Sequence, residues 1–164
     1  MNKNNKKGFT LIELLIVVAI MAIIASVVFV ALNPLQRFQD SRDSVRWQQT
    51  SQILNAIKLY QVDHGGADLT AVSDLVAGNF YMIGTDDSNC DNNICDVEVT
   101  GDDFCVDLSG LVDSGYLSAM PISPNGEGDW DDGHTGYIIS TTSTGAVFIQ
   151  ACESENSPEI VLSR

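Results

Sequence analysis

Hydrophobic residues fill the first part of the chain in one long block. Residues 9–32 read FTLIELLIVVAIMAIIASVVFVAL, and Glu13 is the only charged residue among them. This block exceeds the roughly 20 residues that an α-helix needs to cross a bilayer. Lys3, Lys6 and Lys7 precede it, and the positive-inside rule predicts that they stay in the cytoplasm while the rest of the chain crosses. We therefore expect a transmembrane helix at residues 9–32.

A cleaved secretory signal peptide is a competing interpretation, because a basic leader before an apolar run is typical of both. No small-x-small cleavage site followed by a turn ends the run. The helical pattern also continues past residue 32 instead of breaking. Both observations favour a helix that stays attached to the rest of the chain.

A second pattern, with one apolar and one polar helical face, extends from residue 33 to residue 64. The apolar face is formed by residues at helical spacing, namely Ile53, Ala56, Ile57 and Tyr60. Pro34 removes a helical hydrogen bond and crowds the preceding turn, so we expect a kink or local melting there. Gly65-Gly66 ends the helix. This amphipathic continuation is expected to bury one face against the domain that follows.

Residues 65–164 are expected to form one globular head with β-structure near its end. Two β-rich runs flank a Ser/Thr/Gly turn between residues 137 and 153, which predicts a hairpin. Two short amphipathic helices are expected earlier, with Leu75 and Leu111 on their apolar faces. A chain of 164 residues has room for one such core. The predicted fold class is α+β, a long N-terminal α-helix packed on a small antiparallel β-sheet.

Charge is distributed unevenly between the two parts of the chain. Residues 1–62 carry seven Lys/Arg and three Asp/Glu, whereas residues 63–164 carry one and nineteen, so the formal charges are +4 and −18. A head this acidic is repelled by nucleic acid and by anionic lipid headgroups. We therefore predict no nucleic-acid binding, and bound cations are the more natural partners.

All four cysteines lie in the acidic head, namely Cys90, Cys95, Cys105 and Cys152. If the head lies outside the cytoplasm, two disulfides are the expected outcome. A zinc site is the rival interpretation, but the gaps lack the paired close spacing of zinc ribbons. Four cysteines permit three pairings, and the one we expect joins Cys90 to Cys95 in a small loop and Cys105 to Cys152.

Little in the sequence supports catalysis. His64 and His134 are the only histidines, they are seventy residues apart, and no Ser or Cys motif accompanies either. We therefore do not expect an enzyme.

The segment KKGFTLIELLIVVAIMAIIA resembles the N-terminus of type IV pilins and of the pseudopilins of type II secretion. The resemblance rests on a basic leader, Gly8, the aromatic Phe9, and a glutamate at the fifth position of an apolar helix. It is strong over residues 6–31, weaker over residues 42–66 and faint in the head, except that residues 111–125 look like the segment leading into the sheet of these proteins. It implies that residues 1–8 are a leader, that a prepilin peptidase cuts after Gly8, and that the new terminus at Phe9 is N-methylated.

Glu13 requires an explanation, because an acid at bilayer depth is costly. Cleavage after Gly8 creates a positive amine at Phe9, and Glu13 of a neighbouring subunit can neutralise that amine when subunits stack with an axial offset. Glu13 is thus expected to act in assembly. The alternative is a glutamate near the membrane edge that snorkels or is protonated.

Two acidic clusters are candidate calcium sites. The first follows the EF-hand spacing, with Asp87, Asn89, Asp91 and Glu98 at positions one, three, five and twelve. Asn92 replaces the usual glycine at position six, and a solvated acidic loop closed by a disulfide is the favoured alternative. The second contains Glu127, Asp129, Asp131 and Asp132, and by position and composition it resembles the acidic C-terminal loop in which major pseudopilins hold calcium.

The resemblance implies a structural subunit of a type IV pilus or pseudopilus. Its expected partners are further copies of itself, the prepilin peptidase and an inner-membrane assembly platform. It would be a single-pass protein of the cytoplasmic membrane before assembly, with its N-terminus inside, and part of an extracellular or periplasmic filament afterwards. The alternative is a membrane-anchored binding module that keeps its leader and displays a calcium-stabilised acidic domain.

Overall fold

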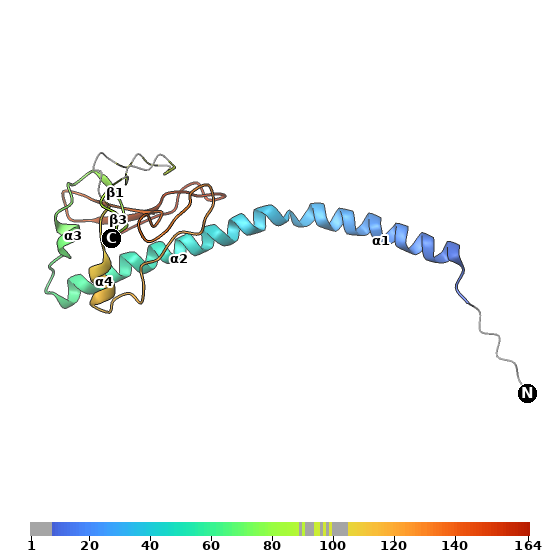
Figure 1. Ribbon diagram of the computed structural model, residues 1–164, viewed down its shortest axis with the longest axis horizontal. Coiled ribbons are helices and arrows are strands. Elements are labelled where there is room, and N and C mark those ends of the chain that lie inside the picture. The colour runs from blue at the N-terminus through green and yellow to red at the C-terminus, as the bar shows by residue number, and fades with distance from the viewer. Residues whose placement is uncertain (1–7, 89, 91–93, 96, 98, 100–104) are drawn as a thin grey trace, which may run out of the picture. The chain divides into compact units, whose positions relative to one another are not determined.

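The computed structural model describes residues 8–88, 90, 94–95, 97, 99 and 105–164 (Figure 1). The chain divides into two compact units, Met1–Phe38 and Gln39–Arg164. Each unit is described by itself below.

The first unit is dominated by helix α1, Leu11–Leu32. Apolar residues occur on all of its sides, and none of its residues is buried. Its most apolar window has a mean hydropathy of 3.2, so by length and composition the helix is able to cross a membrane. The transmembrane prediction for residues 9–32 is therefore matched by a helix of suitable length.

A helix break separates α1 from helix α2, Pro34–Asp63. Asn33 adopts a left-handed conformation with φ 38° and ψ 71°, which asparagine tolerates better than most residues. Pro34 then occupies the first position of α2, where its missing N–H costs no helical hydrogen bond. The predicted interruption at Pro34 is confirmed. One residue, Asn33, breaks the helix by adopting the left-handed conformation.

The second unit contains a four-stranded antiparallel sheet in the order β1-β2-β3-β4. The strands are β1 Phe80–Met82, β2 Tyr137–Thr141, β3 Val147–Ala151 and β4 Val161–Ser163. The predicted hairpin is confirmed as β2 and β3. Gly145, with φ 82°, lies in the turn between them, where glycine alone adopts a positive φ without strain. The two short helices are α3, Thr70–Ser73, and α4, Ser109–Asp113. Leu111 lies in α4 as predicted, whereas Leu75 follows the end of α3, so the first helix is shorter than predicted.

Buried side chains cover both faces of the sheet. On one face, the predicted apolar stripe of α2 packs against alternate strand residues; this cluster includes Ile53, Ala56, Ile57, Tyr137, Ile139 and Ile149. On the other face, a second cluster includes Met82, Trp130, Ile138, Cys105 and Cys152. The fold class is therefore confirmed as α+β, with a long helix packed on a small antiparallel sheet.

Truncation of Ile57 tests this packing. Ile57 is 1% exposed within the helix–sheet core, so Ile57→Ala leaves a cavity and should lower the free energy of unfolding by about 2–5 kcal/mol. The measurement is denaturant unfolding of the full chain in detergent. Leu59→Ala is the matched control, because Leu59 lies on the same helix and is 55% exposed. Equal losses for the two variants would contradict the assigned core face.

Candidate functional site

Gly8 and Phe9 lie in an exposed segment without helical structure just before α1. Among the described residues, no atom outside Gly8 and its chain neighbours lies within 4 Å of the position that a Cβ on Gly8 would occupy. The predicted cleavage bond is therefore open to a protease, and a terminus created at Phe9 would precede the first helical turn by one residue, Thr10.

Glu13 has a partner within its own chain. Its carboxylate accepts hydrogen bonds from the backbone N–H and the hydroxyl of Thr10, at 2.8 and 2.7 Å, and its own N–H donates to the Thr10 hydroxyl at 3.3 Å. This reciprocal pattern is a capping box, which starts α1. Thr10 was not among the predicted site residues, although the spacing Thr-x-x-Glu before an apolar run is the sequence signal of a capping box.

A second functional candidate is a buried ionic cluster in the head, centred on Arg46, whose side chain is 0% exposed. Each of its five N–H groups is used. The acceptors are Asp43 Oδ1 at 2.8 Å, Glu155 Oε1 at 3.0 Å, Glu153 Oε1 at 3.0 Å, the Pro124 carbonyl at 2.9 Å and Ser123 Oγ at 3.2 Å. A buried guanidinium with all its donors satisfied links α2 to two segments distant in sequence.

The carboxylates around Arg46 are themselves held by backbone groups. Asp43 accepts the N–H groups of Glu155, Asn156 and Ser157 at 2.8–3.2 Å. Glu153 accepts the indole N–H of Trp130 at 2.8 Å. It also accepts the backbone N–H groups of residues 126–128. The segments at 123–130 and 153–157 therefore fold around two carboxylates.

These contacts lower the pKa values of two carboxyl groups, Asp43 and Glu155. Burial would raise the pKa of Asp43, but the backbone N–H groups of residues 155–157 together with Arg46 outweigh it and lower the pKa below its ordinary value. Hydrogen bonding from Arg42 lowers the pKa of Glu155, and Arg46 adds to this effect. Both groups are thus held as carboxylates at neutral pH.

No pattern in the sequence predicts this cluster. The charge pattern at Asp43 and Arg46 was visible as an i, i+3 pair, and that pair is present. Glu153 and Glu155 lie more than one hundred residues away from Arg46, and no spacing pattern connects them to α2. Only the fold brings them together.

The predicted disulfide pairing is wrong, although two disulfides are present. Cys90 pairs with Cys105 and Cys95 with Cys152. The Cys105 N–H donates to the carbonyl of Asp86 at 3.1 Å, so Cys105 is held next to the segment that carries Cys90. Proximity through this backbone bridge, and not proximity in sequence, decides the pairing.

The EF-hand-like loop lies largely outside the described residues. Asn89, Asp91 and Glu98 are among those not described, and Asp87 is exposed. Nothing in the described part of the chain therefore tests calcium binding at this loop.

The second acidic cluster forms turn contacts. Asp131 Oδ1 accepts the N–H groups of Gly133 and His134, each at 2.9 Å. Asp129 Oδ1 accepts from the side-chain amide of Asn125 at 3.0 Å. Glu127 donates its N–H to Glu153, and the carbonyl of Asp132 accepts from Thr85. The carboxylates of Asp129 and Asp131 thus serve separate turns, and calcium at this cluster stays a prediction.

Comparison with protein families identifies the N-terminal segment. The prokaryotic N-terminal methylation motif matches residues 3–29. The chain carries this prepilin-type motif. Comparison with curated proteins and with solved structures found no match. The matched motif is the prepilin-type cleavage and methylation motif of type IV pilins and pseudopilins. The long apolar helix α1 and the helix-on-sheet head are a pilin-like α+β arrangement.

Removal of Arg46 should strongly destabilise the head. Arg46→Met leaves the buried Asp43 and Glu153 carboxylates without their cation, and breaking a buried pair in this way costs about 3–5 kcal/mol of unfolding free energy. Denaturant unfolding monitored by tryptophan fluorescence measures the loss. Arg37→Met is the control, because Arg37 is exposed; a similar loss in both variants would show that net charge, not the cluster, is responsible.

The cluster also predicts a pH dependence. Because the pKa values of Asp43 and Glu155 are lowered on folding, their contribution to stability is complete above their ordinary pKa values of about 4. It is lost as the pH falls towards the folded-state values. The stability difference between wild type and Asp43→Asn should therefore be largest near neutral pH and shrink below about pH 4. Unfolding curves across this range test it, and a constant difference would contradict it.

Proposed function

We propose that this protein is the structural subunit of a type IV pilus or a type II secretion pseudopilus, assembled as a helical filament after cleavage between Gly8 and Phe9. The observation that carries the proposal is the methylation motif at residues 3–29, which ends within the exposed apolar helix α1. The exposed segment at Gly8 and Phe9 supports processing there.

Helix α1 supports assembly because its apolar surface needs an environment outside the head. A helix that is hydrophobic on every side is stable in a bilayer or inside a bundle of helices. Identical subunits that meet head-to-tail through different surfaces form open helical fibres when the rotation does not close. Such a fibre would surround α1 with copies of itself, and the cytoplasmic membrane would hold the subunit before assembly.

Glu13 supplies the proposed driving force for leaving the membrane. The capping box with Thr10 satisfies hydrogen bonds of the carboxylate, but Thr10 brings no positive charge, so the cost of the charge in lipid remains. The amine that cleavage creates at Phe9 of a neighbouring subunit would compensate it. Processing requires a prepilin peptidase, and export of the filament requires an assembly platform in the inner membrane.

The mature N-terminus and a Glu13→Gln variant test this proposal together. Mass spectrometry of wild-type filaments should find chains that begin at methylated Phe9. The Glu13→Gln chain should show the same N-terminus but remain in the membrane fraction, because glutamine preserves a capping box while removing the charge. Filament yield in sheared cell supernatants is the measurement.

Two outcomes would overturn it. A chain that retains Met1 in the membrane would indicate an anchored binding module. Normal filament yield from Glu13→Gln would show that the charge has no role in assembly. Lys58→Gln, which removes a charge from α2, is the control for a general effect of charge changes.

A further inference from the structure

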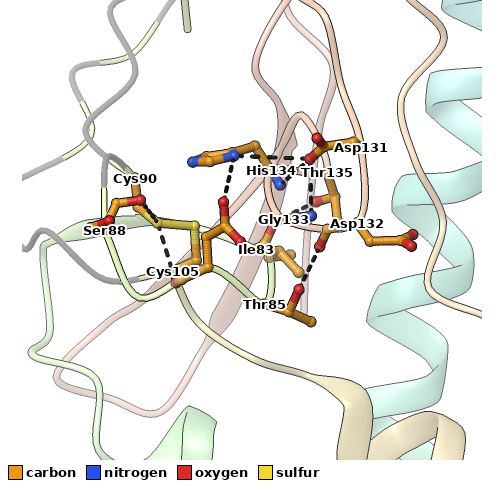
Figure 2. Close-up of a disulfide and its surroundings, with 11 residues drawn as sticks. Ile83, Thr85, Ser88, Cys90, Cys105, Asp131, Asp132, Gly133, His134 and Thr135 are labelled. Carbon is orange, nitrogen blue, oxygen red and sulfur yellow. Dashed lines mark hydrogen bonds and ion pairs between the residues drawn. A yellow bond between two sulfur atoms is a disulfide. The ribbon is translucent and has the colours of Figure 1, made fainter.

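His134 lies against the disulfide between Cys90 and Cys105 (Figure 2). The two sulfur atoms and a ring nitrogen of His134 all lie within 4.8 Å of one another. The carboxylate of Asp86 lies beside the same ring, with Oδ2 3.4 Å from Nδ1. Two sulfurs and an imidazole form a ligand set that zinc prefers, and a carboxylate next to a ligating histidine is the usual way to orient its ring.

Backbone hydrogen bonds hold this arrangement together independently of the S–S bond. The Cys105 N–H donates to the Asp86 carbonyl at 3.1 Å, and the Thr135 N–H donates to the Ile83 carbonyl at 3.0 Å. The Val106 N–H donates to the carbonyl of the strand residue Met82 at 2.7 Å. Cleavage of the disulfide therefore leaves the segments with Asp86, Cys105 and His134 tied to the edge of the sheet.

The His134 turn is also fixed locally. Asp131 Oδ1 accepts the N–H groups of Gly133 and His134. A Cβ on Gly133 would lie 2.7 Å from the carboxyl carbon of Asp86, so this carboxylate packs directly on the glycine backbone. Asp86 and His134 are thereby preorganised relative to each other.

The surroundings of Cys90 accommodate a reduced thiol. Its Sγ lies 3.6 Å from the carbonyl oxygens of Asp86 and Ser88, and either oxygen can accept an S–H once the disulfide is cleaved. Cys90 and Cys105 are buried, whereas the His134 side chain is 21% exposed. The cluster thus combines buried sulfur ligands with a partly exposed imidazole.

We propose that reduction of the Cys90–Cys105 bond converts this cluster into a zinc site, with both thiolates and one imidazole nitrogen of His134 as protein ligands and Asp86 as the positioning residue. Water would occupy the fourth position, as in zinc sites with three protein ligands. The disulfide and the metal are then mutually exclusive states of the same residues. This inference goes beyond the proposed filament function and does not depend on it.

A dithiol is the reductant for the Cys90–Cys105 disulfide. The dithiol gives two electrons and two protons to the S–S bond, becomes a disulfide itself and leaves two cysteine thiols. Zinc then displaces both thiol protons as it binds the thiolates. With Zn–S bonds of about 2.3 Å in a tetrahedral site, the sulfur atoms move to about 3.8 Å apart.

Cobalt and zinc titrations test the proposal. The full chain in detergent is reduced with a dithiol, freed of reductant under nitrogen and titrated with Co²⁺ and then Zn²⁺. We expect one equivalent of Co²⁺ to bind with thiolate-to-cobalt charge-transfer absorption, which Zn²⁺ abolishes, and no such absorption from the oxidised chain. His134→Gln should weaken Zn²⁺ binding at least tenfold, and Asp86→Asn should weaken it about 10–100-fold.

Matched controls separate this site from the other cysteines and the other histidine. His64→Gln should leave Zn²⁺ affinity unchanged, because His64 is exposed at the end of α2. Cys95→Ser/Cys152→Ser should keep the absorption, and Cys90→Ser/Cys105→Ser should lose it. The reverse result, or equal Zn²⁺ affinities for wild type and His134→Gln, would overturn the proposal.

Circular dichroism recorded in parallel covers the case in which reduction loosens the head. A reduced chain that loses its fold and regains it with one equivalent of Zn²⁺ supports the site, because metal binding then supplies folding free energy. A reduced chain that stays unfolded with Zn²⁺, or stays folded and binds no metal, would overturn it.

Discussion

The arrangement of the head depends on the ion pairs and hydrogen bonds that the buried guanidinium of Arg46 forms. Removing a full charge from water costs several kcal/mol unless hydrogen bonds and counter-charges replace the lost solvation. The segments at 123–130 and 153–157 supply much of that replacement through the carboxylates of Glu153 and Glu155, a hydroxyl and a carbonyl. Neither segment belongs to the sheet. Backbone hydrogen bonds hold the strands in place, whereas the ion pairs and hydrogen bonds of this cluster hold the two loops. The loops are therefore fixed on α2 by electrostatics.

The residues after β3 tie the ionic cluster to the covalent framework. Cys152 lies in the apolar cluster on one side of the sheet and is bonded to Cys95, whereas the adjacent Glu153 reaches Arg46. Trp130 connects the two environments, because its ring packs in that apolar cluster while its N–H donates to Glu153. A shift of the chain at this point would therefore disturb a disulfide, an aromatic contact and a buried ion pair together.

The sequence was informative where local patterns determine structure. The apolar block, the break at Pro34, the stripe through Ile53 and Ile57 and the hairpin all follow from periodicity and turn chemistry, and the structure confirms them. The cysteine pairing and the partners of Arg46 depended on contacts between residues far apart in sequence. Such contacts are decided by backbone bridges, as at Asp86 and Cys105, and no spacing rule encodes them. Strands β1 and β4 were missed because each has three residues, which are too few for a periodic signal.

Arg46 and Glu13 show two different solutions to the cost of an isolated charge. The fold surrounds Arg46 with carboxylates of its own chain, so its compensation is complete in a single subunit and contributes to the stability of the head. Glu13 receives hydrogen bonds from Thr10 but no counter-charge from it. A carboxylate that receives hydrogen bonds but no counter-charge from its described neighbours would favour an assembly that brings a cation to it, because a charge in lipid is costly. Arg46 therefore stabilises the fold of a single chain, whereas Glu13 is proposed to act between subunits.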